Sequence, residues 1–215
     1  MKKFYVLLGV FLSIHSLASA DNNNVFIGQA GINNIVSSNQ LGSSESISIT
    51  QSGDDQSFTA SQKVSDNKLI GVQNGARDVA SVMQSGVNNS VNSIQSGTEH
   101  VFSSMQTGNN NEISSKQYGD QEFSNVTQIG NSNIYNTLQG VAGAFDTTSA
   151  GNHILAVQTG TSNIGNISQA GTQNYINTNQ TGELNKITAS QVDNFSHITI
   201  AQTGNGNNAQ ASQGR

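Results

Sequence analysis

The sequence of 215 residues contains no cysteine, no proline and no tryptophan, and only 10% of its residues are charged. The absence of cysteine excludes disulfide bonds, zinc–thiolate sites and thiol nucleophiles. The net charge of −5 argues against an electrostatic nucleic-acid surface, so no nucleic-acid partner is expected. Only 33% of the residues are hydrophobic, which is typical of disordered chains, but disordered chains are also rich in charge and proline. The low hydrophobicity therefore needs another explanation.

Asparagine and glutamine supply that explanation, because the chain holds 29 of the first and 21 of the second. Seventeen of the glutamines share one register, with steps of 11 residues and a single step of 19. They are Gln29, Gln40, Gln51, Gln62, Gln73, Gln84, Gln95, Gln106, Gln117, Gln128, Gln139, Gln158, Gln169, Gln180, Gln191, Gln202 and Gln213. Self-similarity at a fixed period is the signature of repeat architectures.

Glycine follows the glutamine at an offset of two residues in 13 of the 17 units. These glycines are Gly31, Gly42, Gly53, Gly75, Gly86, Gly97, Gly108, Gly119, Gly130, Gly160, Gly171, Gly182 and Gly204. A glycine at a fixed offset predicts a turn that needs positive φ or a close backbone approach.

The residues that precede each glutamine alternate between apolar and polar side chains. Ile47 and Ile49, for example, lie four and two residues before Gln51, and the odd offsets mostly carry Ser, Asn, Thr or Lys. Alternation with period two predicts a half-buried β-strand of about six residues in each unit. The expected fold class is therefore all-β.

A longer period of 22 residues distinguishes alternate units, because seven alternate units, from that of Gln62 to that of Gln202, carry asparagine five residues after the glutamine. These positions are Asn67, Asn89, Asn111, Asn133, Asn163, Asn185 and Asn207. The intervening units carry Gln56, Asp78, His100, Glu122, Ala144 and Ser196, with Asn174 as an exception. Two kinds of corner predict an amyloid-like parallel β-solenoid with two strands per 22-residue coil and about eight coils. Residues 140–151 are expected to form a loop that interrupts the register.

In such a stack, each inward glutamine or asparagine lies over an identical residue at a spacing of ~4.8 Å. A ladder of amides in which each side chain bonds the one above and the one below satisfies groups that would each cost about 1–3 kcal/mol unpaired. The first strand, with inward residues from Asn23 to Gln29, and the last, from Asn207 to Gln213, lack any capping segment. We therefore expect the chain to polymerise end to end, with Gln29, Gln40, Gln202 and Gln213 nearest to the growing ends.

The first twenty residues have the pattern of a secretory signal peptide. Lys2 and Lys3 precede an apolar run, and Ala18 and Ala20 fit the small-residue rule for cleavage after residue 20. The expected division is a signal peptide at 1–20 and the solenoid at 21–215, without a transmembrane segment. The mature protein is then secreted and extracellular.

Residues with catalytic or metal-binding chemistry are scattered. His100, His153 and His197 are far apart in the sequence and indicate surface or corner positions, so no metal site is expected. Asp54, Asp55, Asp120 and Glu122 fall on turns, where solvated charge opposes aggregation. We expect no catalytic residue, no cofactor and no enzymatic activity.

Units of the form Gln-x-Gly-x-x-Asn resemble the curlin repeat across residues 23–213. Clear instances begin at Gln84 and Gln158, each 11 residues before the next glutamine of the register. The resemblance implies a subunit of curli, which are extracellular functional-amyloid fibres that support adhesion and the biofilm matrix. It also implies as partners further copies of the same chain, another curlin subunit, and the curli secretion pore with its chaperones, in a cell-surface fimbrium.

Two alternatives remain open. The octapeptide from Ile27 to Asn34 is similar to the first repeat of the curli nucleator, which would make the chain a minor subunit that templates another curlin. The second alternative, of a different class, is a monomeric surface-binding solenoid, either an adhesin or an ice-binding protein.

One feature departs from the family pattern. Curlin-family fibre subunits carry an N-terminal export segment before the first repeat, whereas here Asp21 and Asn22 run directly into a strand.

Overall fold

A computed structural model of the protein describes the backbone of residues 3–7, 12–19, 22–140 and 149–214, with side chains from residue 22 onward. These ranges form nineteen strands and no helix, in two parallel sheets. The odd sheet contains β1 (Lys3–Leu7), β3 (Asn24–Ala30), β5 (Ser46–Asp54), β7 (Lys68–Ala76), β9 (Ser90–Thr98), β11 (Glu112–Asp120), β13 (Ile134–Gln139), β15 (Ile164–Gln169), β17 (Lys186–Gln191) and β19 (Asn208–Gln213). The even sheet contains β2 (Leu12–Ser19), β4 (Asn34–Ser43), β6 (Ser57–Ser65), β8 (Val79–Val87), β10 (Val101–Asn109), β12 (Phe123–Asn131), β14 (His153–Thr161), β16 (Tyr175–Glu183) and β18 (His197–Thr203).

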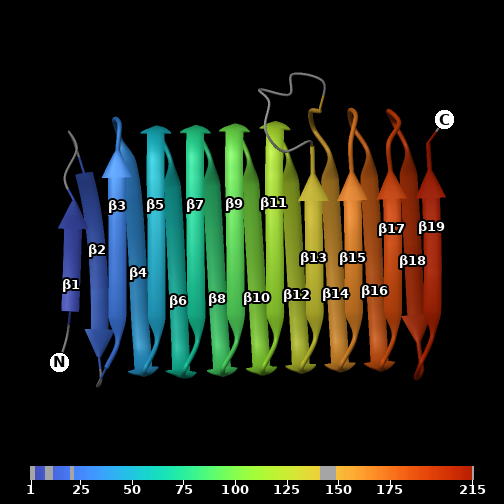
Figure 1. The fold of residues 1–215 in the computed structure, drawn as a ribbon, viewed down its shortest axis with the longest axis horizontal. Coiled ribbons are helices and arrows are strands. Elements are labelled where there is room, and N and C mark those ends of the chain that lie inside the picture. Colours follow the sequence, from blue (N-terminus) through green and yellow to red (C-terminus); the bar gives the residue numbers. More distant parts are fainter. Residues whose placement is uncertain (1–2, 8–11, 20–21, 141–148, 215) are drawn as a thin grey trace.

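Each strand pairs in parallel with the strand two places further along the chain, so the chain winds as a coil of two strands per turn (Figure 1). The partners of β10 are β8 and β12, and Gln106 lies between Gln84 and Gln128 in register. This arrangement confirms the expected parallel β-solenoid of about eight coils. Most strands are nine residues long rather than six, because the ladder continues past the glutamine and through the glycine that follows it.

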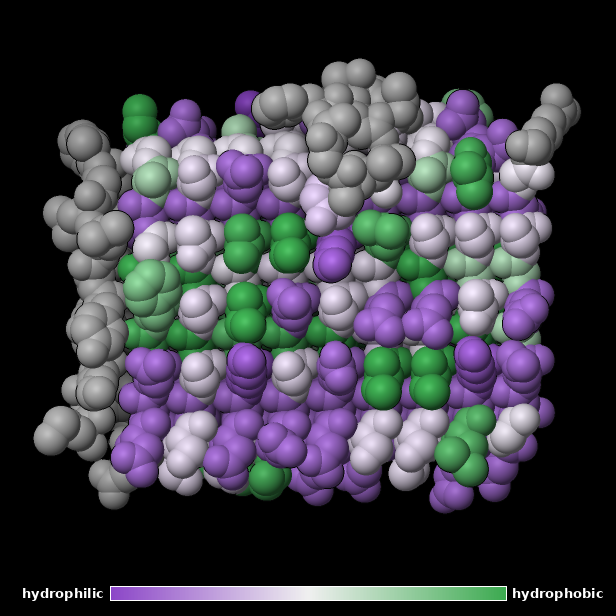
Figure 2. Space-filling model, viewed as in Figure 1, coloured by the Kyte–Doolittle hydropathy of each residue, from purple (hydrophilic) through white to green (hydrophobic). Residues whose placement is uncertain are grey.

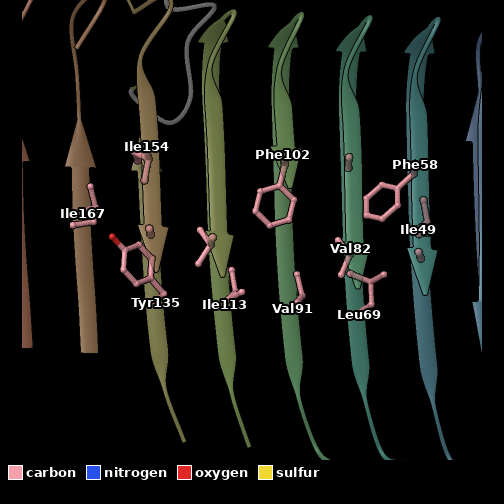
Figure 3. Packing of buried hydrophobic residues seen from close by; sticks show 14 of the residues in the cluster. Ile49, Phe58, Leu69, Val82, Val91, Phe102, Ile113, Tyr135, Ile154 and Ile167 are labelled. Atoms are coloured by element: carbon pink, nitrogen blue, oxygen red, sulfur yellow. The ribbon is translucent and has the colours of Figure 1, made fainter. Parts of the chain in front are cut away.

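The core is a thin layer between the two sheets, filled by the inward residues four and two positions before each glutamine (Figure 3). Phe58, Phe102 and Tyr135 are its largest side chains. Glycine compensates for two of these rings, since a Cβ added to Gly71 would lie 2.3 Å from the Phe58 ring, and one added to Gly165 would lie 2.2 Å from the Tyr135 ring. Bulk on one rung is thus balanced by a missing side chain on another.

The inserted segment leaves the coil intact on both of its sides. In the even sheet Gln128 pairs with Gln158, and in the odd sheet Gln139 pairs with Gln169, although both pairs are 30 residues apart instead of 22. Within the expected loop of 140–151, residues 141–148 lie outside the described residues. The register therefore resumes with the same strand parity after eight extra residues.

The first described residues extend the stack by one further rung, because β1 pairs with β3 and β2 pairs with β4. Ala18 of β2 is the register partner of Gln40, while Lys2 and Ala20 lie outside the described residues. The signal peptide stays a prediction. Within the part of the chain that the structure describes, no helix has the length and apolar character needed to cross a membrane.

Candidate functional site

The glutamines of the register form two continuous ladders, one in each sheet. Within a ladder, the Nε2 of each glutamine donates to the Oε1 of the glutamine on the next rung, over distances of 2.5–3.2 Å. The odd-sheet ladder runs from Gln29 to Gln213 and the even-sheet ladder from Gln40 to Gln202. The direction of donation is constant, so each ladder is polar from one end to the other.

Thirteen of these glutamines, from Gln40 to Gln180, also bridge the two sheets, which sequence reasoning missed. Gln84 in the even sheet donates to the backbone carbonyl of Lys68 in the odd sheet at 3.1 Å, and Gln95 in the odd sheet donates to that of Val79 at 3.1 Å. The acceptor lies 16 residues before the donor except across the insertion, where the Nε2 of Gln158 reaches the carbonyl of Ile134, 24 residues earlier. A glutamine amide has two N–H groups, and this arrangement uses one within its sheet and the other across the core.

The glycines of the register combine positive φ with a close backbone approach. Gly75 has a φ of 144°, and a Cβ placed on it would lie 1.7 Å from the carbonyl oxygen of Gly97 on the next rung. Gly42 does not have a positive φ, but its backbone approaches the next rung just as closely, since a Cβ placed on it would lie 2.1 Å from the carbonyl oxygen of Val64. The turn itself lies two residues later, at residues with positive φ such as Asp55 and Asn88.

Two rows of corner side chains flank the ladders. The asparagine corner joins each even strand to the next odd strand and holds buried Asn67, Asn89, Asn111, Asn133, Asn163 and Asn185, with Asn207 exposed at the end. Each Oδ1 accepts the backbone N–H of the next asparagine at 3.0–3.1 Å, and each Nδ2 donates to the carbonyl of a register glycine on the next rung. The Nδ2 groups of four asparagines also donate to the Oδ1 of the preceding asparagine at 3.1–3.2 Å, so the expected ladder between amides is present and bonds from side chain to backbone accompany it; the donors are Asn89, Asn111, Asn133 and Asn163.

The mixed corner joins each odd strand to the next even strand and contains ionisable residues. It holds Asn34, Gln56, Asp78, His100, Glu122, Asn152, Asn174 and Ser196, of which only Ser196 is not fully buried. Asn152 follows Glu122 in this row, because its backbone N–H donates to Oε2 of Glu122 at 3.0 Å, whereas Ala144 lies outside the described residues. The expectation that Glu122 is solvated on a turn was wrong, because its side chain is fully buried. An odd offset from the glutamine predicts exposure within a strand, but Glu122 lies in the bend between two strands, here called the arc, where the chain turns this position inward.

Burial shifts the titration of these corner groups. Loss of hydration raises the pKa of Asp78 to about 7 and that of Glu122 to about 8, although hydrogen bonds from neighbouring groups oppose both shifts. Burial also raises the pKa of Glu45, which occupies one position of the asparagine corner, and lowers the pKa of His100. Asp78 accepts the backbone N–H of His100 at 3.1 Å, and Nδ1 of His100 accepts that of Glu122 at 3.3 Å.

Many of the remaining polar residues lie on the outside, although the inward rows also bury small hydroxyl residues such as Ser93, Ser124 and Thr178. Figure 2 shows side chains of one face in straight rows across the strands, with hydrophobic patches between polar positions. His153 and His197 are exposed in a row of the even sheet, where Phe123 stacks on His153 and Tyr175 packs against His197. No group of three or more potential metal-ligating side chains occurs among the described residues.

The ladders leave unpaired groups where β3 and β4 begin the register. Oε1 of Gln29 and Oε1 of Gln40 are buried and accept no hydrogen bond from the described residues. At the far end, Gln202 and Gln213 accept from Gln180 and Gln191, and no described residue accepts from their own Nε2. One end thus presents acceptors and the other presents donors.

The chain matches no protein-family model, no curated protein and no solved structure.

Proposed function

We propose that this protein is a non-enzymatic structural subunit that assembles end to end into extracellular curli-like amyloid fibres. In this role it supports cell adhesion and the biofilm matrix. The mature chain would be secreted after cleavage behind Ala20 and would form a homopolymer, with another curlin subunit and the curli secretion machinery as further partners. Curlin-like repeats from residue 23 to residue 213 support this assignment.

The observation that carries the proposal is the polarity of the two glutamine ladders. Once residues 1–20 are removed, the acceptors on Gln29 and Gln40 and the donors on Gln202 and Gln213 lie at opposite ends of one stack, and none of them has a partner among the described residues. A buried amide group without a partner costs about 1–3 kcal/mol, and unpaired strand edges are templates for another chain. Joining two copies end to end supplies partners for the unpaired amides and pairs the free strand edges.

Purified residues 21–215 test the proposal directly. We expect thioflavin-binding fibrils that appear after a lag phase, and we expect preformed fibrils added at trace amounts to abolish that lag. A chain that stays monomeric for weeks at high concentration would contradict the proposal.

The nucleator function is the second candidate, favoured by the octapeptide from Ile27 to Asn34. It makes a different prediction in the same assay. A nucleator forms few fibrils by itself but shortens the lag of a second curlin at trace amounts, whereas a principal subunit forms abundant fibrils alone.

A further inference from the structure

The edge formed by β3 and β4 is incompletely satisfied even though β1 and β2 lie on it. The side chains of Gln29 and Gln40 are 6% and 0% exposed, yet the Oε1 of each lacks a donor among the described residues. The register partner of Gln40 in β2 is Ala18, which has no amide to offer. The expected signal peptide at residues 1–20, here called the leader, therefore lies on this edge without continuing the glutamine ladder of the even sheet.

The opposite edge, formed by β18 and β19, is complementary in two respects. Gln202 and Gln213 carry amide N–H groups that donate to no described residue. Ile200, Ala209 and Ala211 belong to the inward rows but are only partly buried, because no described strand pairs with β18 or β19 on this side. This edge has free donors and apolar area where the other has free acceptors.

The symmetry of the coil decides how these edges meet. Each 11-residue unit is related to the next by a half turn about the stack axis, since successive units alternate between the two sheets. The strands from β3 to β19 number seventeen, which is odd. Because β19 lies in the odd sheet, a strand that continues the coil must enter the even sheet.

We infer that, in fibres of residues 21–215, successive copies are related by a half turn, so that β3 of the next copy pairs with β18 and β4 pairs with β19. This inference rests on the proposed fibre function and on removal of the leader. In this arrangement Gln202 donates to Gln29 of the next copy, and Gln213 donates to Gln40. Without the half turn, β19 would pair with β3 and one strand position between β18 and β4 would remain empty.

Cross-linking distinguishes the two arrangements, because the chain has no cysteine of its own. Gln210 of β19, Ser37 of β4 and Phe26 of β3 are all exposed and all lie three residues before a register glutamine. Paired strands lie ~4.8 Å apart, within the range that a disulfide spans. The half turn brings Gln210 beside Ser37 of the next copy, and the unrotated arrangement brings it beside Phe26.

The test compares two double variants of residues 21–215, Ser37→Cys/Gln210→Cys and Phe26→Cys/Gln210→Cys, oxidised after fibre formation. We expect covalent ladders on denaturing gels for the first variant and at least tenfold less cross-linking for the second. The reverse result, equal cross-linking in both, or none in either would overturn the half turn.

Image reconstruction of unmodified fibres gives a second measurement that does not depend on the variants. Seventeen strands in two sheets are eight and a half rungs, so we expect a rise of about 41 Å per subunit at ~4.8 Å per rung, with a half turn between subunits. Fibres whose subunits repeat without that rotation would overturn the inference and leave the fibre function standing. A chain that forms no fibres would remove both.

Discussion

At the scale of single residues, the glutamine ladders couple each side chain to both of its neighbours. Gln106 accepts from Gln84 at 3.0 Å and donates to Gln128 at 2.9 Å, and it also donates to the carbonyl of Ser90 in the opposite sheet. Removing one amide therefore leaves three groups without their partner.

We predict that Gln106→Leu lowers the free energy of unfolding by about 2–5 kcal/mol, because each buried unpaired group costs about 1–3 kcal/mol while leucine returns some apolar burial. Chemical denaturation of the monomer measures the loss. The matched control is Gln173→Leu, since Gln173 is an exposed turn residue, and we expect a change within about 0.5 kcal/mol there. Equal effects of the two substitutions would contradict the role of the ladder.

The mixed corner makes stability depend on pH. The pKa of Asp78 and the pKa of Glu122 are raised on folding, so their neutral forms favour the folded state fully below about pH 4 and this contribution is lost as pH rises through 7 to 8. His100 has the opposite sign, because its lowered pKa removes stability as pH falls below 6.5. We predict that the free energy of unfolding decreases between pH 6.5 and pH 9.

The double variant Asp78→Asn/Glu122→Gln should remove the part of this decrease that these two carboxyls contribute and leave only the part from Glu45, whose pKa burial also raises, as followed by denaturation across the same pH range. Glu183→Gln, a substitution of an exposed carboxylate, serves as the control and should keep the dependence of the original chain. A double variant that retains the full pH dependence would refute the assignment to these two carboxyls.

The sequence predicted the ladder glutamines because their spacing is strict, but it predicted neither their bonds across the core nor the burial of Glu122. The bonds across the core depend on the distance between the sheets, which no periodicity reports. The burial of Glu122 depends on the arc, where the alternation of a strand no longer applies. Asn34, Asn152 and Glu45 also occupy corner positions, and the offset of five residues from a glutamine is the signal that identifies Asn34 and Glu45.

At the scale of the structural element, the register glycines at the ends of the strands allow the backbones of two neighbouring rungs to approach closely. Gly75 combines positive φ with a contact to Gly97, whereas Gly206 has a φ of 69° and nothing within 4 Å of its added Cβ. We predict that Gly75→Ala destabilises the fold by more than 3 kcal/mol and that Gly206→Ala costs about 1 kcal/mol, the typical cost of positive φ alone. Thermal unfolding of both variants measures the difference, and similar losses would show that φ rather than stacking explains the glycines.

The insertion between β13 and β14 should be dispensable for the coil. The backbone N–H of Gly140 donates to Gln169 and that of Asp120 donates to Ser149, which places Gly140 and Ser149 at consecutive positions of the arc. We predict that deletion of residues 141–148 leaves the free energy of unfolding unchanged within about 1 kcal/mol and leaves fibre formation intact. Loss of folding in the deletion variant, measured by circular dichroism, would contradict this expectation.

The length of the strands was only partly predictable at this scale. Alternation ends at the glutamine, so the sequence predicts six residues, whereas most strands continue for three more. The glycine allows this continuation because it keeps the backbone close to the next rung without a side chain between them.

At the scale of the whole molecule, stability accrues by stacking similar rungs, because a two-strand coil buries too little apolar surface to be stable alone. The period of 11 residues was enough to predict the parallel solenoid, since every rung repeats the same local choices. The polarity of the ladders was not predictable, because it depends on which amide atom faces which end. That polarity is the feature that turns a stack into a directional building block.

X-ray diffraction from aligned fibres of residues 21–215 tests the central claim most directly. If copies join by continuing the coil, we predict a strong reflection at ~4.8 Å along the fibre axis and a sheet-spacing reflection near ~10 Å across it. A fibre pattern without the reflection along the axis, or a chain that remains a discrete particle with closed ends, would contradict the account.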